Sequence, residues 1–483
     1  MPQHRTRTSD TRSAAPSRAA GLTLVAAALA AALASGCSRA DTAESARSPG
    51  DGAEPARTRT FGSDWPTFLG PEADGTSPET GILTDWSGGL EIVWQIEAGE
   101  GYGAPTTSRG RLFFFDRHGD QARLAALNAE TGEELWRREY STSYEDLYGY
   151  SGGPRASAVV DEDRVYTFGT EGRLRAHRVA DGKLLFDLDT SRRYGVQQNF
   201  FGVGSTPVIE GDLLIAMIGG SPPGSPSTTS GNATPNGSAI VAFDKLSGEE
   251  RYRLGDDLAS YAGLRVATLG DRRLGLAFVR GGLIGFEPSE GRQEFFFPWR
   301  ARRLESVNAS TPVVEGTRVF LTETYGPGGV LLEIGEGQPE VVWKDGRRAQ
   351  AMASHWSTPI HRRGTLYGSS GMSSGNADLR AVDFATGKVL WSEPGLERTS
   401  LLYVDGHFVV LGERGQVDLV RASPERFERV GTWRPQDKNG RALLRYPAWN
   451  APVLSPGRLY VRGWDRLLAA ELIPSPSREG AEP

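Results

Sequence analysis

One short motif recurs along the chain, and this repeat constrains the fold more than any other feature. A glycine followed four residues later by an aromatic residue occurs at Gly132 and Trp136, Gly182 and Phe186, Gly248 and Tyr252, Gly291 and Phe295, and Gly387 and Trp391. Successive glycines lie 50, 66, 43 and 96 residues apart, and the last interval equals two repeats of 48. A period of about 40–50 residues with several strands per unit is typical of β-propeller blades.

A second marker follows the same period. It is a small or apolar residue that stands seven places before an apolar, strand-like position. The pairs are Pro105 and Leu112, Ala158 and Val165, Pro207 and Leu214, Ala267 and Leu274, Pro312 and Val319, Pro359 and Leu366, Leu402 and Val409, and Pro452 and Leu459. Their spacings are 53, 49, 60, 45, 47, 43 and 50 residues. Eight markers indicate eight blades.

Each unit reads as four strands. The stretch STPVVEGTRVFLTE, Ser310 to Glu323, holds two apolar runs separated by a turn, which is the pattern of a β-hairpin. The repeated glycine supplies the positive φ that such turns require. The aromatic residue then falls on the outer strand, where we expect it to pack between neighbouring blades. Every blade would therefore need the same turn and the same large side chain.

The last unit is short of one strand. Asn450 to Leu472 supplies only three, and the segment Gly89 to Ala98 stands just before the first unit. Pairing these two segments would close the ring and remove its exposed sheet edges. The sequence therefore predicts an all-β fold, an eight-bladed propeller of four-stranded antiparallel blades over residues 89–473, closed by an N-terminal strand. Seven blades are the alternative.

The first residues form a predicted signal peptide, 1–36. Four arginines precede an apolar run, Gly21 to Ala34, which is too short for a comfortable membrane span and ends in small residues. Cys37 follows at the place where a bacterial lipoprotein is cleaved and acylated, so we expect lipidation there. A conventional signal with an incidental cysteine is the alternative.

The remaining parts follow from composition. Residues 37–63 are rich in Ala, Ser, Pro and charge and predict a disordered tether, 64–88 form a lead-in to the propeller, and 474–483 form a disordered tail. We expect an exported protein of the periplasm or cell surface, held on the outer membrane by lipidated Cys37. Because Cys37 is the single cysteine, the chain has no disulfide and no cysteine-based metal site.

The charge argues against one class of partner. The chain has a net charge of −6, and residues 1–36 contain four Arg and one Asp, so the remainder carries −9. Nucleic acid binding favours basic surfaces, so we expect no nucleic acid partner. We expect a monomer that touches the membrane through its lipid anchor alone.

The repeats resemble those of the pyrroloquinoline-quinone-repeat propellers, which share the Thr-Gly…Trp pattern. The resemblance covers about residues 90–472, and the lead-in DWPTFLGPEADGTSPETGILTDW, Asp64 to Trp86, is similar to that of secreted proteins of this kind. It implies a propeller. It does not fix the function, because one branch contains quinoprotein dehydrogenases and another contains the lipoprotein scaffold of the outer-membrane barrel-assembly machinery.

The enzymatic branch implies cofactor-binding residues and motifs that this chain largely lacks. Its alcohol dehydrogenases use an adjacent Cys pair over the quinone and acidic and Asn ligands for Ca²⁺, whereas this chain has no cysteine after Cys37 and so no attached haem motif. Pyrroloquinoline quinone (PQQ) and Ca²⁺ are possible but disfavoured cofactors. His355 and His361 do not have a metal-ligand spacing. The Gly-rich stretch Ile218 to Ser238 lacks the Gly-Lys-Ser/Thr of a phosphate loop. We predict no catalytic or metal-binding residue.

Strand parity predicts where a partner binds. In an antiparallel four-stranded blade, the loop between strands two and three opens on the same side as the connector to the next blade, and the long segments of this chain all fall in those two classes. Long loops on a rigid scaffold commonly carry binding sites, and aromatic residues with Arg are favoured at interfaces. The candidate binding face comprises Tyr148, Tyr150, Arg155, Gln197, Asn199, Phe200, Phe201, His355, Trp356, Trp449 and Asn450, with Tyr144 in the same loops. Lining or plugging the central channel is the alternative role.

Two main functions follow as hypotheses, with polysaccharide binding by exposed Tyr and Trp rings as a minor third. The first is a non-enzymatic, lipid-anchored propeller that binds an envelope protein or a small ligand on this face. The second is a PQQ-dependent alcohol dehydrogenase-like oxidoreductase that uses the same face.

Overall fold

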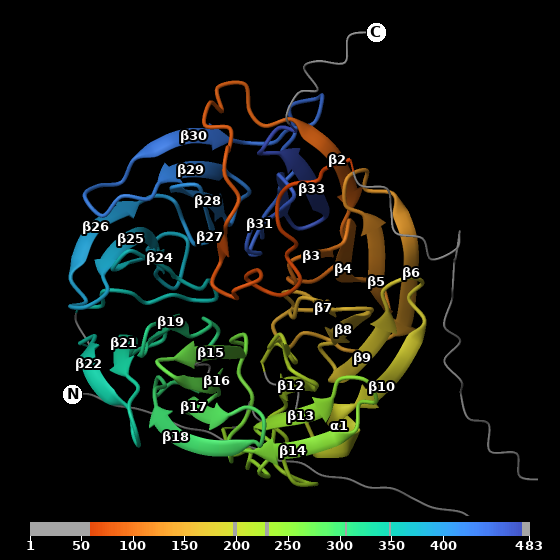
Figure 1. Cartoon of the computed structure of the whole chain (residues 1–483), viewed down its shortest axis with the longest axis vertical. Coiled ribbons are helices and arrows are strands. Elements are labelled where there is room, and N and C mark those ends of the chain that lie inside the picture. The colour runs from red at the N-terminus through yellow and green to blue at the C-terminus, as the bar shows by residue number, and fades with distance from the viewer. Residues whose placement is uncertain (1–57, 197–199, 228–230, 305–306, 347–348, 476–483) are drawn as a thin grey trace, which may run out of the picture. The chain divides into compact units, whose positions relative to one another are not determined.

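The computed structural model describes residues 58–196, 200–227, 231–304, 307–346 and 349–475, and they form eight blades arranged in a ring (Figure 1). Neighbouring strands within each blade pair antiparallel. Among the described residues, α1 (Thr190–Tyr194) is the one α-helix. The predicted eight-bladed all-β propeller is confirmed.

The blades follow one another along the chain, and their strands run from the ring axis outward. Blade 1 contains β3 (Thr106–Ser108), β4 (Arg111–His118), β5 (Gln121–Asn128) and β6 (Glu134–Ser141); blade 2 contains β7 (Val159–Asp161), β8 (Arg164–Phe168), β9 (Arg173–Arg178) and β10 (Leu184–Asp189); blade 3 contains β11 (Val208–Glu210), β12 (Leu213–Met217), β13 (Ile240–Asp244) and β14 (Glu250–Leu254); blade 4 contains β15 (Arg265–Leu269), β16 (Arg272–Phe278), β17 (Gly282–Glu287) and β18 (Arg292–Pro298).

The second half repeats this order. Blade 5 contains β19 (Val313–Glu315), β20 (Arg318–Glu323), β21 (Gly328–Glu333) and β22 (Glu340–Lys344); blade 6 contains β23 (Ile360–Arg362), β24 (Thr365–Ser370), β25 (Asp378–Asp383) and β26 (Val389–Pro394); blade 7 contains β27 (Thr399–Val404), β28 (His407–Gly412), β29 (Val417–Arg421) and β30 (Arg429–Trp433); blade 8 contains β31 (Val453–Ser455), β32 (Arg458–Arg462) and β33 (Arg466–Glu471).

The ring closes as predicted. β2 (Ile92–Glu97) pairs antiparallel with β33 and supplies the outer strand of blade 8, with Ile92 opposite Ala470 and Glu97 opposite Arg466. Because β2 comes from the start of the propeller and β33 from its end, their hydrogen bonds join the two ends of the circle.

Burial differs between inner and outer strands because each blade stacks between two others. The second strands are buried over most of their length, and β24 (TLYGSS) and β28 (HFVVLG) are buried at every position. The outer strand β22 is exposed at four of its five positions. Strands buried on both faces read as continuous apolar runs, whereas edge strands are polar or alternating.

A β-bulge on the outer strand sets the aromatic residue of the repeat. In blade 1 Trp136 lies opposite Ala126 and Glu134 opposite Leu127, so the ladder skips Leu135 directly before the Trp. The same shift precedes Phe186, Tyr252, Phe295, Trp343, Trp391 and Trp94. A bulge bends its strand and redirects the following side chain. The aromatic side chain is therefore turned from its own blade toward the next one.

Five of these rings pack on a glycine in the turn of the following blade: Trp94, Trp136, Phe186, Tyr252 and Trp343. The Trp136 indole lies over Gly182, where a Cβ would come within 2.6 Å of the ring, and its Nε1 donates to the carbonyl oxygen of Val179 at 2.9 Å. Gly182 also has φ +71°, a conformation that residues with a side chain rarely adopt. The turn thus requires glycine for two reasons, which explains why Gly and the aromatic residue recur together.

Blade 7 departs from this pattern. Gly431 follows the bulge there, at the position that is aromatic in the other seven blades. The Trp86 side chain of the lead-in covers it, 2.8 Å from the place of a Cβ. Trp343 and Trp94 complete the series, although neither stands four residues after a glycine.

The lead-in, residues 64–88, crosses the middle of the ring (Figure 1). Trp65 exchanges two backbone hydrogen bonds with Thr107 of blade 1, and Pro66 accepts one from Val160 of blade 2. Farther along, the Ala73 carbonyl oxygen accepts from Arg265 Nη1 of blade 4 at 2.7 Å. This segment therefore bridges blades on different sides of the central channel.

The lead-in also adds a strand that the repeat does not predict. β1 (Thr76–Ser77) pairs parallel with β27, so the sheet of blade 7 has five strands. The lead-in contacts the tight-turn face of the ring, since Asp64 accepts from Arg109 N and Asp405 accepts from Gly81 N. The channel is thus covered on the face opposite the long loops.

Several predicted segments lie outside the described residues. These are the signal peptide 1–36, Cys37, most of the tether 37–63 and most of the tail 474–483. Of the predicted tether, residues 58–63 are described. Thr58 donates to Glu130 of blade 1, and Arg59 pairs with Glu471 of blade 8 at 2.5 Å.

Candidate functional site

The long loops gather on one face of the ring and surround a cavity of about 250 Å³ on its axis. We call these the loop-rich face and the axial cavity. Phe68 and Leu69 of the lead-in line the cavity together with the connectors of the blades. The remaining lining residues are Tyr102, Tyr150, Arg155, Phe201, Gly204, Thr206, Tyr261, Gly263, Val307, Ala309, Tyr325, His355, Trp356, Ser357, Thr358, Arg398, Ser400, Leu401, Tyr446, Trp449, Asn450 and Ala451.

Aromatic rings form a continuous chain of contacts along the wall of this cavity. This aromatic collar consists, in order of contact, of Tyr325, His355, Trp356, Trp449, Tyr150, Phe201 and Tyr261, with Tyr102 against Trp449. Neighbouring ring centroids lie 4.8–6.0 Å apart, and most pairs are tilted. These separations lie in the range of favourable aromatic contacts, so each ring of the collar is held by its neighbours.

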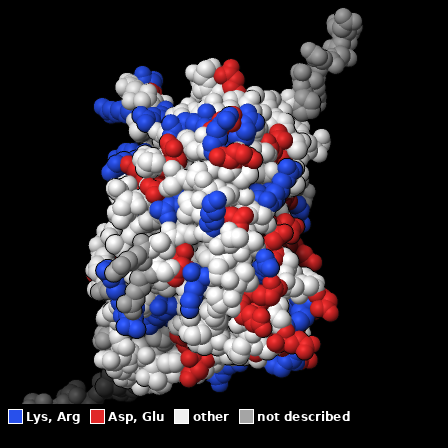
Figure 2. All heavy atoms as spheres, turned by 90° about the vertical axis from the view of Figure 1, so that its left-hand side faces the viewer, with Lys and Arg blue, Asp and Glu red and all other residues white. Residues whose placement is uncertain are grey.

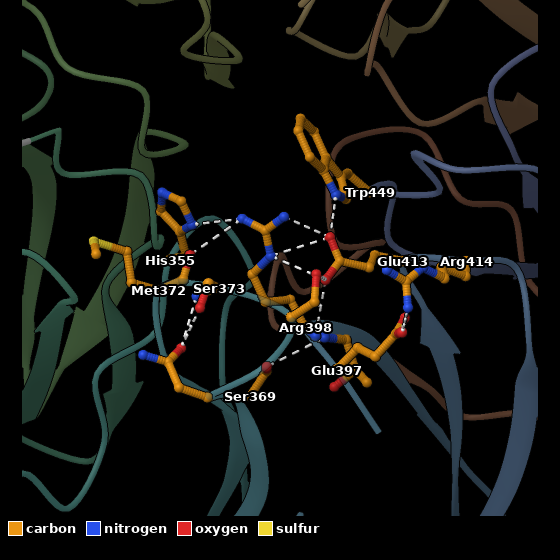
Figure 3. Close-up of polar contacts among 12 residues, drawn as sticks. His355, Ser369, Met372, Ser373, Glu397, Arg398, Glu413, Arg414 and Trp449 are labelled. Carbon is orange, nitrogen blue, oxygen red and sulfur yellow. Dashed lines mark hydrogen bonds and ion pairs between the residues drawn. The ribbon is translucent and has the colours of Figure 1, made fainter. Parts of the chain in front are cut away.

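One buried ion pair holds the collar in place (Figure 3). Arg398, which precedes β27, pairs with Glu413, which follows β28, at 2.5 Å. Glu413 also accepts from Trp449 Nε1 at 3.0 Å and from Ser374 Oγ at 2.6 Å. The Arg398 guanidinium lies over the rings of Trp356 and Trp449, 4.3 and 5.2 Å from their centroids. Cation–π contact and ion pairing thus fix two neighbouring indoles.

The network determines the protonation of two of its members. Burial alone would raise the pKa of Glu413, but the hydrogen bonds from Arg398, Ser374 and Trp449 hold it below its ordinary value. Burial, followed by the charge of Arg398, lowers the pKa of His355 to about 3. At neutral pH Glu413 is therefore charged and His355 is neutral.

The contacts also fix the His355 tautomer. Arg398 Nη1 lies 3.2 Å from His355 Nδ1, and a guanidinium can only donate. Nδ1 must then be the bare acceptor, which leaves the proton on Nε2, 2.8 Å from the Tyr325 hydroxyl. His355 thus links Arg398 to Tyr325 and has no free basic nitrogen for acid–base chemistry.

A second ion pair supports the opposite side of the cavity. Arg155 pairs with Asp146 at 2.6 Å, and their side chains are 9% and 2% exposed. Arg155 also lies over the rings of Tyr102 and Tyr144, at 5.5 and 5.8 Å. Asp146 accepts from the backbone N–H of Tyr150 and so shapes the loop that carries this ring.

Most of the residues of the predicted binding face lie at this cavity. Tyr150, Arg155, Phe201, His355, Trp356, Trp449 and Asn450 line it. Tyr148 is half exposed and lies beside Phe200 and Phe201. Phe200 is 2% exposed and packs beneath Tyr148 and Arg280. Gln197 and Asn199 lie outside the described residues.

Sequence reasoning missed the residues that organise the collar. Arg398 and Glu413 lie in short segments next to strands, where loop length gives no signal. Glu413 could have been found by strand parity, because every loop between the second and third strands opens on the loop-rich face. Asp146 lies inside a long connector, but nothing in the sequence pairs it with Arg155.

On the side that Figure 2 shows, basic and acidic side chains are interspersed. In the part of the chain that the structure describes, no helix is both long and apolar enough to cross a membrane. The axial cavity with its collar is the candidate site on the loop-rich face.

Comparison with known proteins gives a family and a fold. The model of the family described as outer membrane protein assembly factor BamB matches residues 83–233 and 236–400. No curated protein sequence matches this chain.

Solved structures with the same fold include a BamB protein, an alcohol dehydrogenase and a designed protein. BamB from Moraxella catarrhalis is 13% identical, with a TM-score of 0.55, 79% of this chain covered and 99% of that one. Quinohemoprotein alcohol dehydrogenase from Comamonas testosteroni is 13% identical, with a TM-score of 0.58 and coverages of 87% and 82%. The computationally designed Ika8 protein is 12% identical, with a TM-score of 0.51 and coverages of 80% and 100%. Such low identities establish the fold alone.

The family model spans more than half of the chain, and the docking of each outer-strand aromatic on the next blade is the structural form of the repeat that the family shares. This chain belongs to the BamB family of PQQ-repeat propellers.

Proposed function

We propose that this chain is a non-enzymatic binding module of the bacterial cell envelope, which holds a partner on its loop-rich face. One observation carries the proposal: the connectors converge on an aromatic cavity that the lead-in lines with Phe68 and Leu69. Exposed rings at its rim, including Tyr150 and Tyr446, are about half accessible. Aromatic side chains around a central depression, with Arg among them, are the composition of interface hot spots.

The family supports the compartment and the kind of partner. Its description refers to the assembly of outer membrane proteins. We propose accordingly that this chain is exported, is anchored to the outer membrane by lipidated Cys37, and binds an envelope protein as a monomer. Replacement Cys37→Ala tests the anchor: the variant should be recovered in soluble form without the mass of the acyl chains. An unchanged mass and an unchanged membrane fraction would contradict it.

The residues of the cavity do not fit PQQ with Ca²⁺, the pair that the enzymatic branch implies. PQQ is a tricarboxylate, and both arginines of the cavity are already neutralised by Asp146 and Glu413. The Glu413 oxygens are occupied by Arg398, Ser374 and Trp449 and are therefore poorly placed to bind Ca²⁺. Within the described ranges no group of three or more His, Cys, Asp or Glu could hold a metal ion. We derive no reaction through this cofactor.

Site-specific photo-crosslinking tests the binding face. A photoreactive amino acid at Tyr148, which is 50% exposed, should form adducts with an envelope protein in cells. Leu246 is the matched control: it is 54% exposed but lies in the turn between β13 and β14, on the opposite face. Equal adducts at both positions, or none at Tyr148, would contradict the proposal. Adding PQQ and Ca²⁺ to the purified protein tests the alternative, and dye-linked alcohol oxidation would replace the binding role with an enzymatic one.

A further inference from the structure

The axial cavity is electrically balanced. Its two cationic side chains, Arg155 and Arg398, are each paired with a buried carboxylate at 2.5–2.6 Å. His355, which lies beside Arg398, is uncharged at neutral pH because burial lowers its pKa to about 3. A charged ligand entering the cavity would lose its hydration without finding an unpaired counter-charge, and such transfer is strongly unfavourable. The cavity therefore favours an uncharged ligand.

Many polar groups of the cavity are engaged within the protein, and the buried Nε1 of Trp356 is an N–H donor that finds no partner among the described residues. Besides Asp146, Arg155 donates to the carbonyl oxygens of Gly153 and Ser151. The remaining contacts are Asn450 Nδ2 to Tyr102 O, Ser157 N to Thr206 Oγ1, Thr311 N to Thr358 Oγ1, and Phe201 N to the Tyr261 hydroxyl. A sugar presents many hydroxyl groups, and each one buried without a partner is unfavourable. The cavity therefore favours an apolar ligand over a carbohydrate.

Size limits the ligand to about one ring. An apolar cavity of about 150 Å³ accommodates benzene, and the axial cavity measures about 250 Å³. Its wall is the aromatic collar, and apolar side chains of Phe68, Leu69 and Val307 complete the lining. A ring inserted here can adopt tilted contacts with several neighbours at once. A single aromatic side chain with its backbone at the rim matches this space.

We propose that the axial cavity binds one uncharged aromatic side chain, Phe or Tyr, presented by an extended segment of a partner polypeptide. This inference rests on the proposed function and names the chemistry that the loop-rich face recognises. The partner's backbone would lie across the rim, where the half-exposed rings of Tyr150 and Tyr446 stand.

Short peptides test the ligand class. We would titrate the full-length protein with acetyl-Gly-Gly-Phe-Gly-Gly-amide by calorimetry and follow the tryptophan fluorescence, to which Trp356 and Trp449 of the cavity contribute. Burying a Phe side chain predicts binding about 10- to 100-fold tighter than that of the peptide with Ala in place of Phe. The peptides with Lys or Glu at this position, and a neutral disaccharide, should bind no better than the Ala peptide. Equal affinity for the Phe and Ala peptides, or tighter binding of a charged peptide or the sugar, would overturn the proposal.

A cavity-filling variant locates the site. Ala309 lines the cavity, so Ala309→Trp should fill it and weaken binding of the Phe peptide at least tenfold. The melting temperature and circular dichroism report whether the variant folds, and Tyr150→Ala is a second variant that removes a rim ring without adding volume. If both variants fold and bind the Phe peptide as well as the natural protein does, the cavity is not the site.

The crosslink at Tyr148 separates this inference from the proposed function. One outcome is that Ala309→Trp still forms the Tyr148 crosslink to the partner while the Phe peptide fails to bind the natural protein. In that case the loop-rich face is an interface, but the inference that its cavity binds an aromatic side chain is wrong. If no crosslink forms at all, the proposed function fails first.

Discussion

The buried ion pair of the collar allows a quantitative prediction. Arg398→Met keeps much of the side-chain volume but leaves Glu413, whose side chain is fully buried, without its counter-charge. Removing one partner of a buried pair typically lowers the free energy of unfolding by about 3–5 kcal/mol. Because Ser374 and Trp449 still donate to Glu413, we expect the lower end, about 3 kcal/mol. For a propeller of about 400 residues this lowers the melting temperature by roughly 3 °C.

The neighbouring residue supplies the control. Arg414 pairs with Glu397, as Figure 3 shows, but its side chain is 66% exposed. Exposed pairs contribute at most about 1 kcal/mol because water screens them. Arg414→Met should therefore change the unfolding free energy by less than about a third of the effect of Arg398→Met. Urea denaturation followed by Trp fluorescence measures both, and similar losses in the two variants would refute the reasoning.

The pH dependence of the unfolding free energy is a second test of the Arg398–Glu413 ion pair. In the natural protein the pKa of Glu413 lies below 4.5, so the stability it contributes is present above pH 4.5 and is lost only as the pH falls through this lowered pKa. Without Arg398, burial raises the pKa of Glu413 above 4.5, and the charged carboxylate becomes unfavourable at high pH. The loss caused by Arg398→Met should therefore shrink as the pH falls from 8 to 5. A pH-independent loss would mean that Glu413 does not carry the effect.

Three further predictions concern the blades and the collar. Gly182→Ala should lower the unfolding free energy by about 1–3 kcal/mol more than Gly211→Ala, because both glycines have positive φ but only Gly182 contacts an indole. Equal losses on thermal unfolding would contradict the packing of Trp136 on Gly182 as the cause. Trp94→Ala, on the closing strand β2, should lower the unfolding free energy by about 3–5 kcal/mol and make β2 susceptible to limited proteolysis before β6. Equally fast cleavage in β2 and β6 would argue against a role of Trp94 in closing the ring. The pKa of His355 is about 3 in the folded protein and 6.5 in the unfolded chain, so falling pH protonates the unfolded chain first and destabilises the natural protein. Between pH 7.5 and 5.0 this loss of unfolding free energy amounts to at most about 2 kcal/mol, and His355→Gln should remove it. Denaturation of both proteins at each pH measures the difference.

The fold was accessible from the sequence because it depends on local requirements that repeat. Gly182 and Trp136 satisfy the same turn and the same contact as their counterparts in other blades, so periodicity reveals them. Trp343 escaped the glycine count because the turn before it has a different length, and Trp94 escaped it because its strand follows the lead-in and not a hairpin turn. The bulge that redirects the ring is present in both strands. Trp86 could not be assigned at all, since it replaces a missing side chain of a distant blade.

The site was accessible only in part. Loop length and strand parity placed Trp356 and Trp449 on one face, because parity follows from antiparallel order alone. The pairing of Arg398 with Glu413 depends on side-chain geometry between neighbouring strands, and it carries no periodic signal. The course of the lead-in is likewise a single event in the chain, which a repeat analysis does not detect.

The route of the lead-in has a consequence for how the molecule is made. Residues 64–77 leave the ribosome before any blade, yet their hydrogen-bond partners Arg265 and Tyr403 are synthesised some 190 and 330 residues later. This early segment therefore remains without these hydrogen-bond partners until most of the chain has been synthesised. The ring itself can close only after β33 has been synthesised, because β2 pairs with that strand.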